Sequence, residues 1–435
     1  MGIPRLSTLL HGLFSTPKGR DHLVTYAAEG SVLVGTVIAY KLAAHELGNA
    51  GFEIYAVVRR TVSFVIPLLM FGLAVALIRF GAMASTDEER WRFTWNAGLL
   101  VLLVGGLVLL VTRIFAPLVG YIIFGDHAHD GLVPDMGLML PGLMMHSVVY
   151  GYWRAAQRMI PANALQAFDL GLVPVAAFLL ADDLSGVMRC MALAWSLSTI
   201  LPFLWLALRH RTSSRIDRSA LWQLLRYGTP RVPGDLAFGA LLALPVFFIN
   251  HVAGIEEGGR CAFGLTLLNM TGALFAPVSL LMLPAVARDL ARGDHARVVR
   301  DTRRTRTLVI SLACIAVIIF QPLAGPLLRI YLGDGLSDLV LPSRVLFIGA
   351  VFYAAYISMR SVLDAYHETA RNSRNIIIAL SVFLAAAGVY VFIWPETVFL
   401  VAMVPVALAL LAVLTWRDTE IVLNKLSDPT NRRAR

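Results

Sequence analysis

Apolar runs of about 20 residues recur along the whole chain, and they restrict its fold more than any other feature. A helix needs about 20 mostly apolar residues to cross the hydrocarbon core of a bilayer, and only elements that satisfy their own backbone groups do so. The sequence therefore predicts an all-α integral membrane protein with about twelve spans. The expected spans are 24–44, 61–80, 95–115, 133–153, 163–181, 187–208, 233–251, 262–284, 308–328, 342–362, 376–394 and 397–416.

The composition excludes a soluble fold of this length. Of the 435 residues, 58% are hydrophobic and 15% are charged, whereas soluble domains have about 45–50% apolar and about 25% charged residues. The three cysteines, Cys190, Cys261 and Cys314, lie in or beside apolar runs without CxxC or Cys/His spacing. We expect small buried residues there, and neither a metal site nor a disulfide.

Basic residues gather in alternate connections between the predicted spans. If the N-terminus is inside, 29 of the 37 Lys and Arg residues lie in internal segments, and the opposite connections are short and acidic. This positive-inside pattern predicts an even number of spans in the inner membrane, with both termini cytoplasmic. The two largest internal connections, 209–231 and 285–307, are each expected to form about one amphipathic helix on the anionic leaflet. The net charge of +9 is then topological, and no nucleic-acid partner is expected.

The chain also divides near its middle. Gly48 follows the first predicted span and Gly254 follows the seventh, and these glycines lie 206 positions apart, close to half the chain length. Both halves run in the same direction from their first helix, which is typical of a parallel repeat. The predicted organisation is a six-helix lobe over 1–208, a basic linker over 209–231, a second lobe over 232–416 and a basic cytoplasmic tail over 417–435.

Short motifs lie at several of the predicted helix ends. Leu47-Gly48-x-x-Gly51-Phe52-x-x-Tyr55 precedes the second span and residues 71–80 (FGLAVALIRF) end it. The other motifs are 150–155 (YGYWRA), Asn163-x-x-Gln166, 225–233 (LRYGTPRVP), and Pro277 with Pro284. Together these resemble the polysaccharide and oligosaccharide-lipid flippases of the multidrug/oligosaccharidyl-lipid/polysaccharide exporter superfamily. Glu53 departs from that pattern, which usually has glycine there.

The resemblance implies a fold and a cargo that composition and periodicity do not show. It implies two six-helix bundles facing each other as a V around a central cavity, and transport by alternating access. It implies an undecaprenyl-diphosphate-linked oligosaccharide as substrate, such as a repeat unit of exopolysaccharide, O-antigen or capsule. The implied partners are this substrate, membrane lipids and a glycan polymerase or export machinery, with no catalytic residues, no ATP and no other cofactor.

Charged residues inside predicted spans are candidates for a binding site, because each costs roughly 2.5–3.5 kcal/mol on insertion. The competing interpretation is a side chain that snorkels from a helix end. A pyrophosphate crossing the membrane needs cationic donors in place of its hydration. We therefore predict anion contacts from Lys41, Arg59, Arg60 and Arg231. Arg59 and Arg60 are expected to open the second helix, where one snorkels and the other faces the cavity.

Acidic groups make up the remaining candidates. Pro230 and Pro233 flank Arg231 and predict a broken helix, which can present a half-helix N-terminus to an anion. Asp235, four residues after Arg231, forms either a local ion pair or a gating contact. Glu29 and Asp169 are the candidate coupling carboxylates. Asp169 and Asn269 are also expected to form hydrogen bonds between helices, and His146 is expected to be a packed polar residue. Arg79 is expected to be a cytoplasmic gate or anchor.

Two other classes of function stay open at this point. A cation-coupled multidrug antiporter of the same superfamily would need a buried carboxylate, for which Glu29, Asp169 and Asp235 are the candidates. A membrane glycan polymerase, ligase or acyltransferase would need larger external loops or a catalytic histidine, and His146, His251 and His367 lack a supporting group of residues. No Ser-His-Asp arrangement, metal motif or P-loop occurs, so an enzyme is the weaker alternative.

Overall fold

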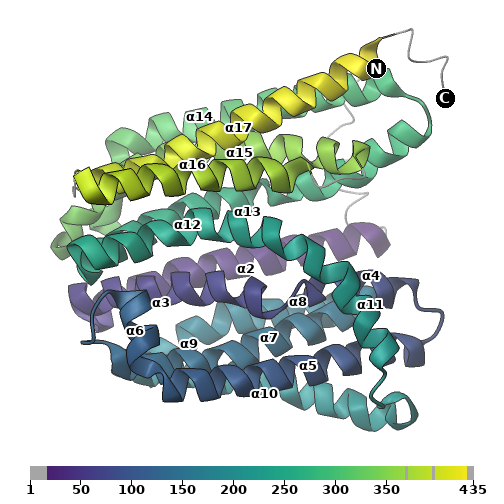
Figure 1. The fold of residues 1–435 in the computed structure, drawn as a ribbon, viewed down its shortest axis with the longest axis horizontal. Coiled ribbons are helices and arrows are strands. Elements are labelled where there is room, and N and C mark those ends of the chain that lie inside the picture. The colour runs from purple at the N-terminus through teal and green to yellow at the C-terminus, as the bar shows by residue number, and fades with distance from the viewer. Residues whose placement is uncertain (1–16, 368–370, 394–396, 429–435) are drawn as a thin grey trace. The chain divides into compact units, whose positions relative to one another are not determined.

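Every element in the part of the chain that the structure describes is helical (Figure 1). The structure is a computed structural model, and it describes residues 17–367, 371–393 and 397–428. The first half contains α2 (Pro17–Glu46), α3 (Gly48–Leu69), α4 (Leu73–Met83), α5 (Asp87–Ile114), α6 (Ala116–Phe124), η1 (Asp130–Leu132), α7 (Val133–Ala155), α8 (Met159–Gln166), η2 (Ala167–Leu172), α9 (Val173–Leu180), α10 (Leu184–Arg209) and η3 (Arg211–Ser213). The second half contains α11 (Arg218–Gly228), η4 (Thr229–Arg231), α12 (Val232–Ala253), α13 (Ile255–Ala291), α14 (His295–Leu332), η5 (Asp334–Leu339), α15 (Val340–Tyr366), α16 (Arg371–Ile393) and α17 (Thr397–Ser427).

The helices confirm the predicted all-α membrane fold. Among the described residues, ten helical segments are long and apolar enough to cross a membrane, and the bent pair of α3 and α4 raises this number to eleven. The remaining expected span, 262–284, falls in α13, where several side chains lie outside the described residues. Within the described residues, the predicted spans follow helical segments to within one or two residues, except that 61–80 crosses the bend between α3 and α4. A bilayer imposes a minimum helix length that the sequence displays directly.

The second predicted span differs from the structure in its start and in its straightness. α3 begins at Gly48, at a residue with positive φ, so the external turn is much shorter than expected. Arg59 and Arg60 consequently lie inside α3 and do not open a helix, which corrects that prediction. The chain bends by 51° between α3 and α4, where Phe71 and Gly72 have positive φ. A glycine is required at the bend, because a Cβ on Gly72 would lie 2.4 Å from the carbonyl oxygen of Gly228 in α11.

The long basic connections also differ from one another. Segment 209–231 contains the short helix α11, as expected. Segment 285–307 is not a separate helix, because α13 runs to Ala291 and α14 starts at His295. Arginine is a good helix former, so the arginine-rich ends extend the two membrane helices instead of folding back. The Asp294 side chain caps α14 by accepting a hydrogen bond from the backbone N–H of Arg297.

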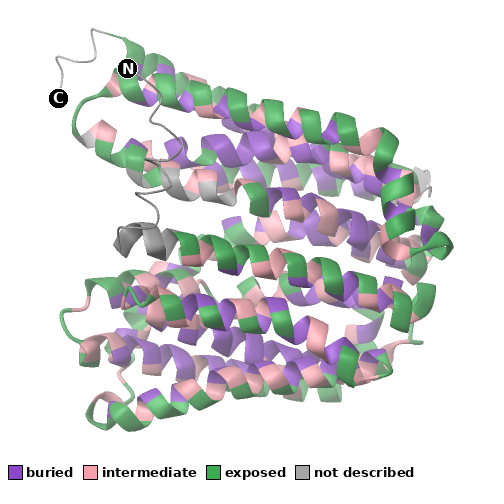
Figure 2. Ribbon diagram, turned by 180° about the vertical axis from the view of Figure 1, so that it is seen from behind, coloured by how far each residue is buried: buried purple, intermediate pink, exposed green. Residues whose placement is uncertain are grey.

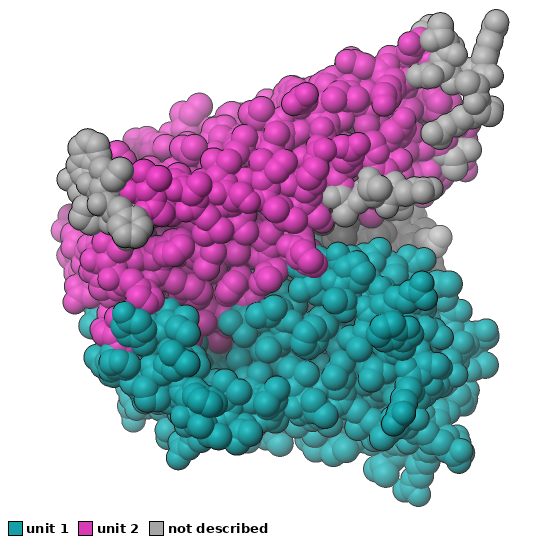
Figure 3. All heavy atoms as spheres, in the orientation of Figure 1, with its two compact units in different colours: residues 1–52, 65–122, 127–232 teal, residues 53–64, 123–126, 233–435 magenta. Residues whose placement is uncertain are grey.

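Two compact units make up the molecule (Figure 3). Unit 1 contains residues 1–52, 65–122 and 127–232, and unit 2 contains residues 53–64, 123–126 and 233–435. The middle of α3 thus belongs to unit 2, although its two ends belong to unit 1. The predicted lobe, linker and tail boundaries stay a prediction.

The interior of unit 1 is built by large aromatic side chains from α5, α7 and α10. Trp91 is fully buried, and its ring lies 5.3 Å from Phe203 and 5.9 Å from Tyr152. Residues from α4 and α11 complete this core, among them Leu77 and Leu224. Such closely packed aromatic rings give the unit a rigid centre on which polar side chains can be held in place.

Apolar side chains also cover the outside of the units. Along α14, one set of large aliphatic residues recurs every three or four positions and stays exposed: Leu308, Leu312, Ile315, Ile318, Ile319, Leu323, Leu327 and Ile330. Within each unit, buried residues alternate along the helices with exposed ones (Figure 2). A soluble protein would not leave such a face in water, whereas lipid tails are as apolar as leucine. The exposed face of α14 is therefore a lipid-contacting surface.

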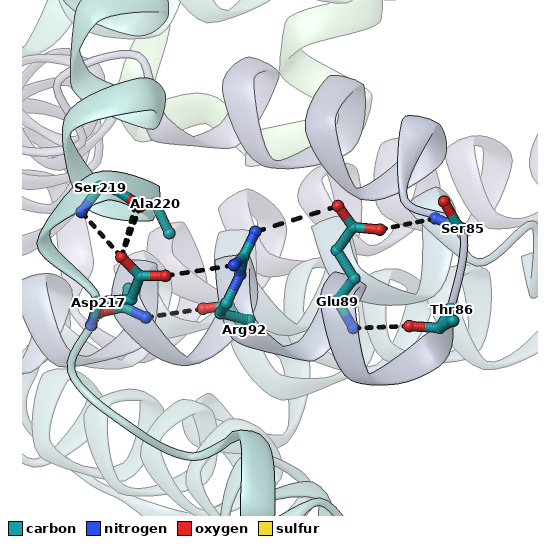
Figure 4. Close-up of polar contacts among 8 residues, drawn as sticks. Ser85, Thr86, Glu89, Arg92, Asp217, Ser219 and Ala220 are labelled. Carbon is teal, nitrogen blue, oxygen red and sulfur yellow. Dashed lines mark hydrogen bonds and ion pairs between the residues drawn. The ribbon is translucent and has the colours of Figure 1, made fainter.

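Polar contacts hold the connection between α10 and α11 to the start of α5 (Figure 4). The Asp217 carboxylate caps α11 by accepting hydrogen bonds from the backbone N–H groups of Ser219 and Ala220, and Arg92 lies 3.4 Å from its other oxygen. The side chain of Asn96 accepts a hydrogen bond from the backbone N–H of Asp217 and donates one to the carbonyl of Arg215. The start of α11 is therefore fixed to unit 1.

We expect the variant Asp217→Ala to unfold more easily at neutral pH, by about 1 kcal/mol, because it lacks the helix cap. Hydrogen bonds from the Ser219 hydroxyl and from the backbone N–H of Ala220 lower the pKa of the Asp217 carboxyl. A carboxyl with a lowered pKa stabilises the fold above its unfolded-state pKa, and this contribution disappears as the pH falls through the folded-state value. The native protein should therefore have a higher thermal unfolding temperature than the variant at pH 7. This difference should shrink as the pH falls below about 4. An equal difference at both pH values would contradict this origin.

Candidate functional site

Arg60 lies buried in the middle of a membrane helix in unit 2. Its position is twelve residues after the start of α3, or about 18 Å along the helix axis, and only 7% of its surface is exposed. Its charge acts on the thiol of Cys261 in α13 and on the hydroxyl of Tyr353 in α15. Arg59 beside it is partly exposed. An arginine at this depth marks a functional position by default.

Aromatic rings and a second arginine lie near Arg60 in the same unit. The Phe238 ring of α12 packs 5.4 Å from Tyr353 and 5.7 Å from Tyr356, and the Arg360 guanidinium lies 5.9 Å from the Tyr356 ring. The charge of Asp235 also acts on Tyr356. We call Arg60, Phe238, Tyr353, Tyr356 and Arg360 the unit 2 cluster. It combines cationic groups for an anion with aromatic faces for an apolar or sugar surface.

A second cationic group lies at one end of unit 1, around Tyr227 of α11. Arg79 donates a hydrogen bond of 2.9 Å to the Tyr227 hydroxyl, and its guanidinium carbon lies 4.5 Å from the ring centre. Arg231 lies 3.7 Å from the same ring centre and donates to the Tyr227 carbonyl. Both arginines are exposed, and no described carboxylate pairs with either. Tyr227 therefore contacts two guanidinium groups, each of which can bind an anion.

The other predicted residues of unit 1 occupy different positions. Lys41 is exposed near the end of α2 and makes no described polar contact. Glu29 of the same helix accepts a hydrogen bond of 2.9 Å from the Gln166 side chain of α8. The predicted break at Pro230 is not seen: the 3-10 turn η4 joins α11 to α12, the residues on either side of it keep helical φ and ψ, and Arg218–Ala253 runs as one helical segment.

Asp169 is the most deeply buried carboxylate among the predicted residues. It has no exposed surface, and it lies in η2, a π-helical segment between α8 and α9. Nδ1 of His146 in α7 lies 2.6 Å from its Oδ2, and the Ser198 hydroxyl of α10 donates to its Oδ1 at 2.6 Å. Trp195 Nε1 donates to its backbone carbonyl, also at 2.6 Å. We call Asp169, His146 and Ser198 the buried polar centre.

The structure groups the predicted residues only in part. Arg60 lies within electrostatic range of Tyr353, and Asp235 within range of Tyr356. Glu29 accepts a hydrogen bond from Gln166, which lies three positions before Asp169. The residues predicted from the sequence did not include Tyr227, Tyr353, Tyr356, Arg360 or Ser198. The signal for two of them was an aromatic residue four positions from an arginine, in Tyr227 with Arg231 and in Tyr356 with Arg360. Among the described residues, no group of three His, Cys, Asp or Glu side chains could hold a metal ion.

Comparison with known proteins assigns a type of fold to this arrangement. A family described as polysaccharide biosynthesis proteins matches residues 23–288. The lipid II flippase MurJ, in an inward closed conformation, superposes with a TM-score of 0.73 at 12% identity, over 94% of this chain and 89% of that one. An inward-facing multidrug resistance MATE transporter gives 0.71 at 13% identity, over 93% and 95% of the two chains.

A third solved structure, the eukaryotic MATE transporter AtDTX14, gives a TM-score of 0.66 at 14% identity, over 95% of this chain and 99% of that one. No curated protein sequence matches the chain. At these identities the likeness concerns the fold alone, and it covers nearly the whole length of each protein. The chain is therefore a multi-pass membrane protein with the fold of these transporters.

Proposed function

This chain belongs to the polysaccharide biosynthesis protein family, and we propose from that premise that it moves an undecaprenyl-diphosphate-linked oligosaccharide across the inner membrane. The movement runs from the cytoplasmic to the periplasmic leaflet by alternating access. Family membership supports a glycan as the cargo. The shared fold with a lipid flippase and with multidrug transporters supports a transporter rather than an enzyme.

The observation that carries the proposal is the unit 2 cluster around the buried Arg60. A pyrophosphate cannot enter hydrocarbon with its charge unmatched, and an arginine replaces its water by charge-assisted, bidentate hydrogen bonds. Tyr353, within electrostatic range of that arginine, packs on Phe238, and the apolar face of a sugar ring can pack on such aromatic faces. The lipid tail can stay in the bilayer throughout.

The two arginines on Tyr227 suit the first contact with this substrate. Arg79 and Arg231 are exposed, and the positive-inside pattern favours the cytoplasmic face for their end of unit 1. An exposed pair of guanidinium groups attracts a diphosphate from the leaflet surface more strongly than a single one. Arg231 therefore keeps its proposed role as an anion contact, and Arg79 joins it. Lys41, exposed near the opposite end of α2, suits a contact on the periplasmic side.

Deletion of the gene is the direct test of this function. We expect the deletion strain to lose surface polysaccharide and to accumulate the lipid-linked repeat unit in the cytoplasmic leaflet, and we expect a plasmid copy to restore export. Surface glycan would be measured by immunoblotting, and the intermediate by mass spectrometry of extracted lipids. Full-length polysaccharide at normal levels in the deletion strain would contradict a flippase. Sensitivity to cationic drugs, without any glycan defect, would favour the cation-coupled multidrug antiporter, which shares the fold and for which the buried Asp169 is the supporting feature.

Topology gives an independent test. The proposal requires both termini and the arginine-rich junction of α13 and α14 in the cytoplasm. Reporter fusions after Arg303 and at the C-terminus should show cytoplasmic activity, and fusions after Glu257 should show periplasmic activity. The opposite pattern would remove the orientation on which the direction of transport depends.

A further inference from the structure

A cavity of about 400 Å³ lies at one end of unit 2, lined by residues other than those of the unit 2 cluster. Its walls come from the first turns of α13, from η5, from the first two turns of α15 and from the Thr397 end of α17. α13 and α15 pack closely beside it, since a Cβ on Gly264 would lie 2.7 Å from Cδ1 of Leu346 and 3.4 Å from the carbonyl oxygen of Pro342. The positive-inside pattern favours the periplasmic face for this end of the unit, so we expect the cavity at the level of the periplasmic lipid headgroups.

One side of the cavity carries an excess of negative charge. Glu257 and Asp338 line it, and their carboxylates lie 2.5 Å and 3.4 Å from nitrogens of the Arg260 guanidinium. The carboxylates of Glu53 and Glu256 lie within 4.0 Å of the same guanidinium, so four carboxylates surround one arginine. Among the described residues, no three such groups are arranged to hold a metal ion. A ligand cation with several N–H donors is therefore favoured on this side.

The opposite charge comes from Arg344 of α15, which lines the same cavity. Its Nε is buried without a hydrogen-bond partner, and no carboxylate of the described residues forms an ion pair with its guanidinium. The helix around it is held in place, because the Gln321 side chain of α14 donates a hydrogen bond of 3.0 Å to its carbonyl and the rings of Phe320 and Phe347 lie 4.2 Å apart. A buried N–H without an acceptor is costly, and an anion in the cavity would supply that acceptor.

The rest of the wall is apolar. Leu341 and Val345 of α15 and Val398 and Val401 of α17 line it. Two of them also reach the outer surface of the unit, since Leu341 is 53% exposed and Val398 is 45% exposed. Apolar side chains at the outer surface of a membrane helix contact lipid tails. The cavity thus combines carboxylates, one guanidinium and an apolar wall that continues to the outside of the unit.

We propose that this cavity binds the headgroup of a zwitterionic phospholipid with a primary ammonium group, phosphatidylethanolamine, from the periplasmic leaflet. Arg344 binds the lipid phosphate, Glu257 and Asp338 accept hydrogen bonds from the ammonium, and the acyl chains lie along Leu341 and Val398. The two charges of the headgroup match the two charged sides of the cavity. The anionic headgroup of phosphatidylglycerol would be repelled by the four carboxylates, and the trimethylammonium group of phosphatidylcholine has no N–H to donate. The site does not depend on the glycan cargo proposed above.

Native mass spectrometry of the delipidated full-length protein, titrated with these three lipids carrying identical acyl chains, tests the site. We expect phosphatidylethanolamine to bind at least about tenfold more tightly than the other two, as charge-assisted hydrogen bonds allow. Arg344→Gln should weaken its binding by about the same factor, whereas Arg344→Lys should keep most of it, because an ammonium also binds phosphate. Asp338→Asn should narrow the difference between phosphatidylethanolamine and phosphatidylglycerol. Equal binding of the three lipids, or native binding by a folded Arg344→Gln protein, would overturn the proposal, and an unchanged difference in Asp338→Asn would overturn the contact with the ammonium.

A matched control and a crosslinking measurement locate the bound lipid. Arg113, near the end of α5, is an exposed arginine without an ion pair to a described residue, and the positive-inside pattern favours the periplasmic face for it as well. Arg113→Gln should therefore bind phosphatidylethanolamine like the native protein. A photoactivatable analogue of this lipid should label residues 337–345 or 397–401 in the native protein and in Arg113→Gln, and not in Arg344→Gln.

Glycerophosphoethanolamine, the same headgroup without acyl chains, should fail to displace the lipid at equal concentration. Displacement by it, or labelling confined to other segments, would overturn a lipid in this cavity. Circular dichroism in detergent shows whether each variant is folded. These measurements use no glycan, so they can fail while the flippase function holds, and the reverse.

Discussion

Replacing Arg60 with Gln should reduce glycan export to the level of the deletion strain while the protein still folds. Arg60 is buried within α3 at about 18 Å from its start. Removing one partner of a buried charge pair weakens binding by about 2–5 kcal/mol, or roughly 30- to 3,000-fold. A pyrophosphate held by Arg60 would lose that interaction during its passage through the membrane. The measurement is surface polysaccharide relative to the amount of protein in the membrane.

Three further variants locate the effect at the anion contact. Arg60→Lys keeps the charge but not the planar fork, so export should recover only in part. Arg59→Gln, at the partly exposed neighbour, should have a smaller effect. Arg329→Gln is the matched control, because this arginine of α14 is exposed and pairs with Asp334 at the surface, and it should export normally. Normal export by a folded Arg60→Gln protein would remove Arg60 from the substrate path.

The spans could be predicted from the sequence because lipid imposes one requirement on every helix. Twenty apolar residues between charged connections leave little freedom. Within the described residues, every predicted span but 61–80, which crosses the bend between α3 and α4, follows a continuous helical segment. The errors lie where polar residues continue a helix, since hydropathy does not mark helix ends outside the bilayer. α3 starts at Gly48 and α14 starts at His295 for this reason. The family resemblance, stated from short motifs near helix ends, is confirmed by the match over residues 23–288.

Individual candidate residues of the site could be named from the sequence. The contacts between residues on different helices could not. A charged residue in an apolar run is visible in the sequence, so Arg60 and Asp169 could both be named as candidates, and their roles stay a prediction. Their partners come from other helices, at separations that depend on packing. His146 lies 23 positions before Asp169 and Ser198 lies 29 after it, and the π-helical turn that brings them together has no local sequence signal. Tyr353 and Arg360 were missed because a tyrosine in a span, or an arginine at its end, is ordinary.

The fold explains why Glu53 can stand where the family pattern usually has glycine. The structure pairs it with Arg260 of α13 at 3.1 Å within unit 2. The residue beside Arg260 is Gly259, on which a Cβ would lie 2.5 Å from the Cα of Glu53. Glu53 and Gly259 are 206 positions apart, the same offset as Gly48 and Gly254, which both have positive φ. The acidic side chain is therefore accommodated by an arginine and by a glycine in the facing helix.

Replacing Arg260 with Gln should destabilise unit 2 by about 3–5 kcal/mol, because it leaves a buried carboxylate without its cation. The guanidinium is 19% exposed and the Glu53 side chain 5% exposed. Three more carboxylates, those of Glu256, Glu257 and Asp338, also lie within 4.0 Å of it. Without the arginine these four groups would repel one another at one end of the unit. The thermal unfolding temperature of the purified variant in nanodiscs should be lower than that of the native protein by several degrees or more.

A double variant separates this electrostatic origin from lost packing. Glu53→Gln added to Arg260→Gln removes the buried charge as well as its partner, so it should recover part of the lost stability, and the coupling between the two changes should be positive. Raising the salt concentration should change the native protein little, since a buried pair is poorly screened. Arg329→Gln breaks an exposed pair of the same chemistry and should leave the unfolding temperature nearly unchanged. If Arg260→Gln were as stable as Arg329→Gln, the four carboxylates would have to be neutral or hydrated, and the Glu53 contact would then contribute nothing to holding α3 against α13.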